Sequence, residues 1–212
     1  MLLEKQRQQI ARVGRQLIDT SLTRATGGNL SIFDPESQLV ALSPSGMDYH
    51  QVTPEDVTVI TLQGEQVDGR GKPSSESAMH RIFYMQRTGI GAVVHTHSVF
   101  STTLATLGWH LPVANYLLAL AGGEVRCAEY AAYGTDRLAE NALQAMAGRN
   151  ACLLANHGLL AIGENLEEAF SIAETVEHCA EYYYRAKCVG APLILTDEQL
   201  SEMLEKIPTY GK

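Results

Sequence analysis

The sequence predicts an α/β fold built on a largely antiparallel β-sheet that is covered by helices. Short apolar runs that are typical of strands come in consecutive groups, turn signals join several of them closely, and helical patterns separate the groups. A doubly wound parallel sheet would instead need strands that alternate regularly with helices. The grouping therefore favours the antiparallel arrangement.

The first third of the chain is predicted to form one helix and four short strands. Residues 3–22 carry apolar side chains at about helical spacing, which indicates an amphipathic helix. The strands are short runs bounded by turn residues, at 29–33, 39–43, 57–61 and 65–68. Asp34-Pro35 is a turn signal between the first pair, and Gly64 indicates a hairpin between the second pair.

The rest of the chain is predicted to contain five more helices and further strands. Ser74 or Ser75 can cap a helix that runs to about Arg87. The other helices follow from apolar spacing, at 99–107, at 135–147 with Thr135 as a candidate cap, at 165–188 and at 197–206. Strands are predicted at 91–97, near 125–130, and on both sides of 156–158 within 151–163.

The composition predicts a single compact domain without a nucleic-acid or membrane partner. The 212 residues are 45% hydrophobic, which allows a sizeable core. The formal net charge is −8, whereas sequence-independent nucleic-acid binding needs clustered Lys and Arg. The apolar stretches are far shorter than the roughly 20 residues of a membrane helix. The N-terminus has no apolar region of the kind found in a signal peptide.

The cysteines predict reduced thiols and a cytoplasmic protein. None of them forms a CxxC pair, and a chain of this size does not depend on disulfides for its stability. They are Cys127, Cys152, Cys179 and Cys188.

Two histidines end the apolar run 91–97 and point to a metal site. Side chains two positions apart in a strand point to the same face of the sheet, so His95 and His97 present their imidazoles together. Neutral imidazole is a good ligand for zinc. The alternative for this pair is two histidines that are hydrogen-bonded at the end of a strand.

A third histidine strengthens the prediction of a metal site. His157 ends another apolar strand, and Gly158 would let the chain turn sharply beside it. Three histidine ligands leave a fourth position for water or substrate, which is typical of a catalytic rather than a structural zinc site. Taken alone, His157 is explained equally well as a turn histidine. For the remaining histidines a structural role is favoured: His50, His80, His110 and His178.

Three loops resemble anion-binding sites. Glu76 follows two serines at a predicted helix start, where spare N–H groups and hydroxyls bind anions and where a carboxylate can act as a general base. The loops 26–29 and 45–46 contain glycines, whose backbone N–H groups can approach a phosphate closely. Each loop alone is also explained by helix capping or by a glycine turn. Together with the three histidines, they point to a small phosphorylated substrate.

Several short motifs occur in an order that resembles the class II aldolases of the fuculose-phosphate aldolase type. They are TGGNLS, SPSG, PSSE, VVHTHS, YAAYGT, LLANHGLLAIG and PTYG. The resemblance spans nearly the whole chain, and the combination is far more specific than any single motif. It implies one catalytic domain over residues 1–212. The implied fold is a sandwich in which helices cover both faces of a large, mostly antiparallel sheet, similar to the adducin head.

The resemblance also implies an active site at the interfaces of a homotetramer with C4 symmetry. One Zn²⁺ per subunit, or another divalent metal, would be held by His95, His97 and His157. The substrate phosphate would lie among Thr26, Gly28, Asn29, Ser45, Gly46, Ser74 and Ser75. Glu76 would be the acid/base, and Tyr116 of the partner subunit would handle the aldehyde oxygen. Tyr133 and Tyr210 would line the aldehyde side.

The implied activity is that of a metal-dependent aldehyde-lyase. A ketose 1-phosphate such as L-fuculose 1-phosphate or 5-deoxyribulose 1-phosphate would be cleaved reversibly into dihydroxyacetone phosphate and a short aldehyde. In the direction of synthesis, Glu76 would remove a proton from dihydroxyacetone phosphate. Two alternatives come from the same superfamily, a methylthioribulose-1-phosphate dehydratase and a ribulose-phosphate 4-epimerase. A third alternative is a catalytically silent metal-binding oligomer.

Overall fold

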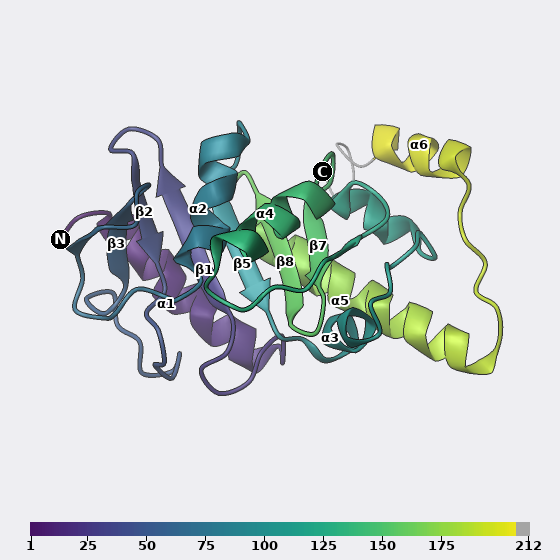
Figure 1. The fold of residues 1–212 in the computed structure, drawn as a ribbon, viewed down its shortest axis with the longest axis horizontal. Helices are drawn as coiled ribbons and strands as arrows, with labels where there is room; N and C mark the ends of the chain where they lie inside the picture. The colour runs from purple at the N-terminus through teal and green to yellow at the C-terminus, as the bar shows by residue number, and fades with distance from the viewer. Residues whose placement is uncertain (207–212) are drawn as a thin grey trace.

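A computed structural model describes residues 1–206 of the chain. The described residues form an eight-stranded sheet with the strand order β4-β3-β2-β1-β5-β8-β7-β6. Helices lie on both faces of this sheet (Figure 1). The predicted α/β fold, with a mostly antiparallel sheet between two layers of helices, is therefore confirmed.

The strands are short, and their bounds lie close to the predicted ones. They are β1 (Asn29–Asp34), β2 (Leu39–Leu42), β3 (Thr58–Thr61), β4 (Gln66–Asp68), β5 (Ala92–Thr96), β6 (Cys127–Ala128), β7 (Ala151–Leu154) and β8 (Gly158–Gly163). Within the described sheet every neighbouring pair is antiparallel except β6 and β7, which are parallel. The central strand β5 pairs with β1 and β8. The first residues of both neighbours therefore lie beside the end of β5, where His95 and His97 occur.

Two apolar layers pack the helices against the sheet. One face carries α1 (Glu4–Asp19), α3 (Val99–Thr106) and α5 (Leu166–Val189), and the other carries α2 (Ser77–Gln86) and α4 (Asp136–Ala145). Ile10, Leu104 and Ile172 belong to the first layer, and Phe83 and Leu138 belong to the second. Burial of such apolar stripes is the dominant favourable term in folding. It fixes α2, whose N-terminus carries Glu76, against the face that also carries His95.

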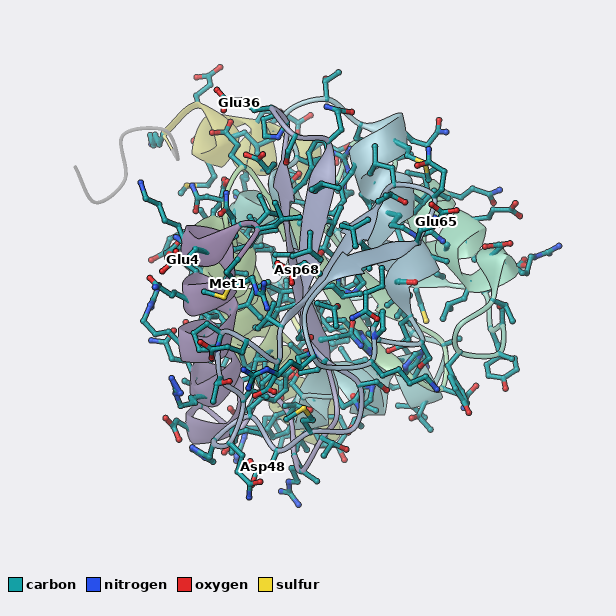
Figure 2. The ribbon with its side chains drawn as sticks, turned by 90° about the vertical axis from the view of Figure 1, so that its left-hand side faces the viewer. Met1, Glu4, Glu36, Asp48, Glu65 and Asp68 are labelled. Carbon is teal, nitrogen blue, oxygen red and sulfur yellow. The ribbon has the colours of Figure 1, made fainter. Side chains whose placement is uncertain are left out.

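A buried arginine ties α1 to the edge of the sheet. Arg7 is 1% exposed, and its guanidinium donates hydrogen bonds to the carbonyl oxygens of Pro54 and Glu55. It also forms an ion pair with Asp68 of β4 at 2.9 Å. Figure 2 shows Asp68 near Met1, and the carboxylate of Asp68 also accepts a hydrogen bond from the backbone N–H of Leu2 at 2.8 Å. These partners compensate the desolvation of the buried charge.

The structure corrects the predicted start of α2. The helix begins at Ser77, and Glu76 occupies the N-cap position, so neither Ser74 nor Ser75 is the cap. The hydroxyl of Ser74 instead accepts a hydrogen bond from the backbone N–H of Glu76 at 3.2 Å. This hydrogen bond holds the turn before the helix, and it places Glu76 where the helix leaves the loop.

The remaining predicted helices are found in the structure, which also contains one short helix that was not predicted. The predicted cap of α4 is confirmed, because the side chain of Thr135 accepts a hydrogen bond from the N–H of Leu138. The last described helix, α6 (Asp197–Lys206), packs against a 3-10 helix, η1 (Tyr116–Ala121), that was not predicted. Within residues 1–206, no helix combines the length and the apolar character that a membrane span requires.

Candidate metal centre and active site

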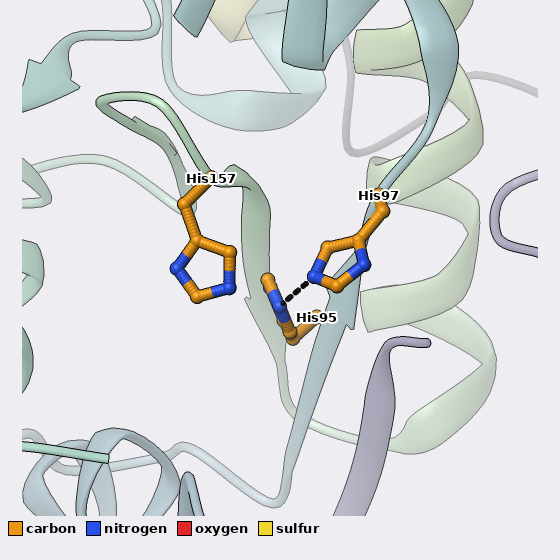
Figure 3. Close-up of side chains that lie close together, drawn as sticks. All are labelled: His95, His97 and His157. Atoms are coloured by element: carbon orange, nitrogen blue, oxygen red, sulfur yellow. Dashed lines mark hydrogen bonds between the residues drawn. The ribbon is translucent and has the colours of Figure 1, made fainter. Parts of the chain in front are cut away.

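Three histidines from different strand ends meet in the structure (Figure 3). His95 lies on β5, His97 directly follows the last residue of that strand, and His157 lies in the turn between β7 and β8. Each offers one ring nitrogen, and these nitrogens all lie within 4.8 Å of one another. The structure therefore brings together the three residues that the sequence singled out as metal ligands.

A glycine allows the turn after His157 to approach the other two histidines. The antiparallel pairing of β5 with β8 sets Thr96 opposite Leu159, one residue after Gly158. A β-carbon on Gly158 would lie 2.3 Å from the carbonyl oxygen of Thr96 and 3.1 Å from Cδ2 of His97. Such distances are shorter than van der Waals contact, so this close approach of the backbone requires glycine.

The protonation of the histidines suits metal binding. Nδ1 of His95 donates a hydrogen bond to the carbonyl oxygen of Leu159 at 2.9 Å, which leaves Nε2 as the nitrogen with a lone pair. Burial, together with the neighbouring imidazoles, holds the pKa of His95 well below its usual value and also lowers the pKa of His97. Both rings are therefore neutral near pH 7, which is the form that binds a metal.

The donor set fits a divalent cation. Nε2 of His95 lies 2.9 Å from Nε2 of His97 in a partly buried site. The dashed line in Figure 3 marks this contact between two nitrogens that can each bind a metal. The carboxylate of Glu76 lies 3.4 Å from Nε2 of His95 and 3.3 Å from Nε2 of His157. Its Oε1 is buried and has no hydrogen-bond partner among the described residues. A cation among these atoms would satisfy all of them, since imidazole and carboxylate are common zinc ligands.

The two oxygens of Glu76 have different surroundings. The side-chain amide of Asn29 donates a hydrogen bond to Oε2 at 2.8 Å, and Oε2 also lies 3.4 Å from Nε2 of His95. Oε1 lies 3.3 Å from Nε2 of His157 and has no hydrogen-bond partner among the described residues. Only 6% of Glu76 is exposed, so the carboxylate has little water to interact with. A carboxylate that is anchored through one oxygen can exchange a proton through the other.

One small pocket collects all the residues that were predicted to bind phosphate. It has a volume of about 110 Å³ and is lined by Thr26, Gly27, Gly28, Asn29, Pro44, Ser45, Gly46, Ser74, Ser75, Glu76 and His97. No Lys or Arg belongs to this described lining, so an anion there would be bound by backbone N–H groups and hydroxyls. Gly28 has a φ of 70°, and a β-carbon there would lie 2.7 Å from the carbonyl oxygen of His95. Its place in the loop therefore requires glycine.

A second pocket opens on the other side of Glu76. It has a volume of about 370 Å³ and is lined by Ser75, Glu76, His97, Tyr130, Ala131, Tyr133, Asn156 and His157. Three of these residues, Ser75, Glu76 and His97, also line the small pocket. A linear substrate can therefore place one end in each pocket and its middle beside the histidines.

The predicted tyrosines have different positions. Tyr133 lines the larger pocket and is 72% exposed. Tyr116 stands at the start of η1, is partly exposed, and does not appear in the described lining of either pocket. Tyr210 lies outside the described residues. Tyr130 and Asn156 were not predicted, although Tyr130 belongs to the motif YAAYGT and Asn156 directly precedes His157.

Comparisons with known proteins show which family the chain belongs to. The model of the class II aldolase and adducin N-terminal domain family matches residues 8–184. A 5-deoxy-D-ribulose 1-phosphate aldolase from Bacillus thuringiensis serovar kurstaki is 48% identical over 212 residues, which cover 100% of both chains. A 5-methylthioribulose-1-phosphate/5-deoxyribulose-1-phosphate aldolase from Rhodospirillum rubrum is 42% identical over 93% of this chain and 88% of its own.

A solved structure is also closely similar. An L-fuculose 1-phosphate aldolase superposes with a TM-score of 0.94 at 48% identity, and the match covers 96% of each chain. The chain therefore belongs to the class II aldolase and adducin N-terminal domain family. The predicted family, fold and enzyme class, a class II aldolase, are confirmed.

Proposed function

We propose that the protein is a metal-dependent aldolase that cleaves a deoxyketose 1-phosphate, with 5-deoxyribulose 1-phosphate as the first candidate. The products would be dihydroxyacetone phosphate and a short aldehyde. One observation carries this proposal: Ser75, Glu76 and His97 form a common wall between a phosphate-sized pocket and a larger open pocket. The relatives support the substrate class, since two are named for 5-deoxyribulose 1-phosphate and the solved structure for L-fuculose 1-phosphate.

The small pocket would bind the phosphate. The glycine-rich loop before β1 and the turn before α2 face each other across it, and both offer hydroxyl groups. Ordered donors of this kind bind an anion without a positively charged side chain. The side chain of Asn29 is already engaged with Glu76, so it would contribute at most its second amide N–H to the phosphate.

Glu76 would be the acid/base through its Oε1. In synthesis this oxygen would take a proton from the carbon next to the carbonyl of dihydroxyacetone phosphate, and in cleavage it would return the proton to that carbon. Asn29 would keep Oε2 fixed during both steps. The exclusion of water around this buried carboxylate strengthens its interactions with the reacting atoms.

The metal would be held by His95, His97 and His157, and zinc is the first choice because three imidazoles with an open position are typical of catalytic zinc. When bound, it would act as a Lewis acid that stabilises the negative charge developing on the substrate oxygens. Another divalent ion could also bind three imidazoles.

The larger pocket would receive the aldehyde. Tyr133 lines its open side, and Tyr130 and Asn156 extend it. Because much of Tyr133 is exposed, contacts from a neighbouring subunit would be needed to close the pocket. We therefore include in the proposal a homotetramer with active sites between subunits, in which Tyr116 of the partner subunit gives its proton to the aldehyde oxygen and Tyr210 covers the same side.

Two further predictions belong to this proposal. Residues 1–212 would act as one catalytic domain. A cytoplasmic location would suit the cysteines, which are all free in the structure. The aldolase names of the relatives favour cleavage over the dehydratase and epimerase alternatives and over a catalytically silent metal protein.

A retro-aldol assay tests the proposed function. Purified protein with bound zinc would receive a panel of ketose 1-phosphates and ketose 5-phosphates, and a coupled dehydrogenase would follow the release of dihydroxyacetone phosphate. We expect release from 5-deoxyribulose 1-phosphate and L-fuculose 1-phosphate but not from the 5-phosphates. A difference of one methyl group in an apolar pocket is worth only about 1–3 kcal/mol, so several aldehydes should be accepted. Loss of water or epimerisation without cleavage would favour the superfamily alternatives.

A further inference from the structure

A chain of buried hydrogen bonds leads from Glu76 into the core. The amide of Asn29 donates to Oε2 of Glu76 at 2.8 Å, and Oδ1 of Asn29 is hydrogen-bonded to Nε2 of His80. Nδ1 of His80 lies 2.7 Å from Oγ of Ser31, which lies 2.6 Å from the hydroxyl of Tyr84. Each of these residues is at most 8% exposed, so the chain is shielded from water.

Two regular elements build this chain. Glu76 is the N-cap of α2, and His80 and Tyr84 follow at intervals of four residues, so the three lie on one face of the helix. Asn29 and Ser31 are two residues apart on β1, so they point to the same face of the sheet. The side chains of the helix and the strand therefore alternate along the contact between the two elements.

The chain occupies a place where apolar side chains would be expected. Ser31 is paired with Leu42 on β2 and Val93 on β5, and both of these neighbours belong to the apolar layer under α2. Polar groups at such a position cost free energy unless all of them are hydrogen-bonded. A polar network in the middle of an apolar layer therefore calls for an explanation beyond packing.

The direction of each hydrogen bond follows from its neighbour. An ionised Glu76 can only accept, so Asn29 must turn its N–H₂ group toward Oε2 and its Oδ1 toward His80. Oδ1 is an acceptor, so Nε2 of His80 carries the ring proton. Burial lowers the pKa of His80 to about 3, so the ring has a single proton.

The remaining two hydrogen bonds, at Ser31 and Tyr84, have fixed directions as well. Since Nε2 of His80 holds the only ring proton, Nδ1 is an acceptor and receives the hydroxyl proton of Ser31. Oγ of Ser31 then accepts from the hydroxyl of Tyr84. All the hydrogen bonds therefore point toward the carboxylate. An amide does not pass protons on readily, so Asn29 makes this a chain that orients groups rather than one that conducts protons.

We propose that His80 is a positioning residue for Glu76, because its Nε2–H locks the Asn29 amide in the orientation that anchors Oε2 and leaves Oε1 to exchange the proton. This inference rests on the proposed role of Glu76 as the acid/base. Without the donor at His80, the Asn29 amide could rotate by 180° and present its oxygen to the carboxylate. Oε2 would then lose its hydrogen bond, and the direction of Oε1 would no longer be fixed.

Two amide substitutions of His80 provide a matched pair. Glutamine places its side-chain nitrogen near the position of Nε2 and can donate to Asn29, whereas asparagine is too short to reach it and can replace only Nδ1. We expect His80→Asn to lower kcat about tenfold or more with KM for the ketose 1-phosphate changed less than about threefold. His80→Gln should keep kcat within about threefold of the native enzyme. Metal content per subunit and the melting temperature of both variants would be measured alongside.

The separation of kcat from KM distinguishes positioning from a merely structural role. Loss of the Asn29 donor leaves Oε2 of Glu76 without its hydrogen bond, so kcat should fall in His80→Asn while KM, metal content and melting temperature stay close to those of His80→Gln. Equal kcat values in the two variants, with native enzyme that cleaves substrate, would overturn the role of His80 and leave the proposed function intact. Native enzyme that releases no dihydroxyacetone phosphate would overturn both.

A spectroscopic measurement keeps the inference testable if His80→Asn does not fold. In full-length protein labelled with ¹⁵N-histidine and loaded with zinc, His80→Gln assigns the signal of His80. We expect a neutral ring with its proton on Nε2. A proton on Nδ1 would mean that His80 cannot donate to Asn29, and this result would overturn the inference whatever the kinetics of the variants.

Discussion

Gly158 lies so close to His97 that a β-carbon on this glycine would come within 3.1 Å of Cδ2 of the imidazole. The same β-carbon would lie 2.3 Å from the carbonyl oxygen of Thr96, which belongs to the backbone and cannot easily move. The absence of a side chain at Gly158 therefore determines how closely the turn that carries His157 approaches the other two ligands.

Gly158→Ala should weaken metal binding about 10–100-fold, in the range of changes that disturb the support of metal ligands. Competition with a chromophoric chelator measures this affinity. Gly190→Ala is the matched control, because its φ of 179° is extended backbone and no heavy atom lies within 4 Å of the added carbon. Equal affinity in Gly158→Ala and the native protein would show that the three histidines do not depend on this close approach.

Glu76→Gln should lower kcat about 10²–10⁴-fold, the usual contribution of a positioned acid/base. The amide keeps the size of the side chain but cannot take a proton from the substrate. KM for the ketose 1-phosphate should change little, since the phosphate pocket also contains many other groups. Steady-state kinetics with measured metal content tests this prediction. A variant that retains zinc and full kcat would exclude Glu76 as the acid/base.

Stability of the metal-free protein should fall as the pH falls below 6.5, partly because of His80. Burial lowers the pKa of His80 from 6.5 to about 3, so the unfolded chain binds the extra proton first as the pH decreases. Between pH 7 and pH 5 this effect removes about 2 kcal/mol from the free energy of unfolding. His80→Gln lacks it, so the difference in stability between native protein and variant should shrink by that amount.

Urea unfolding in chelator at one protein concentration measures this difference at both pH values. The single concentration is necessary because the stability of an oligomer depends on it. A difference between native protein and His80→Gln that stays constant from pH 7 to pH 5 would contradict the prediction.

Glu177→Ala should destabilise the fold by about 1–2 kcal/mol. The N-cap residue of α3, Ser98, makes no side-chain cap hydrogen bond. The carboxylate of Glu177 on α5 replaces that cap, because it accepts from the N–H of Phe100 at 2.7 Å and the N–H of Ser101 at 2.8 Å. Thermal unfolding tests the change, with Glu174→Ala on the same helix as the control. We expect the control to leave the melting temperature nearly unchanged.

Local patterns in the sequence predicted most elements because each strand and helix has its own apolar spacing. The correct assignment of β7 and β8 around His157 rests on two apolar runs separated by a turn with glycine. The parallel pairing of β6 with β7 could not be predicted, since it joins segments through the helix α4. The helix η1 was missed because YLLALA has no polar face, and its only local signal is the cap at Asn115.

The candidate site was predictable where the residues carry their own chemistry. The spacing of His95 and His97 places two imidazoles on one face, and glycines mark the loops that line the small pocket. The partner of Glu76 was not predictable, because Asn29 is 47 residues away in sequence and was expected to bind phosphate. His80 was expected to be structural, and its contact with Asn29 spans 51 residues. Such links depend on how α2 packs on β1, which no local pattern contains.

The most direct test of the central claim is the rate of dihydroxyacetone phosphate release from 5-deoxyribulose 1-phosphate, measured on one preparation before chelation, after chelation and after zinc is returned. We expect release by the native protein, loss of release when the metal is removed, and recovery in proportion to the zinc bound per subunit. Cleavage that continues at the same rate in the fully chelated protein would contradict this expectation, as would no cleavage by protein whose three histidines hold zinc.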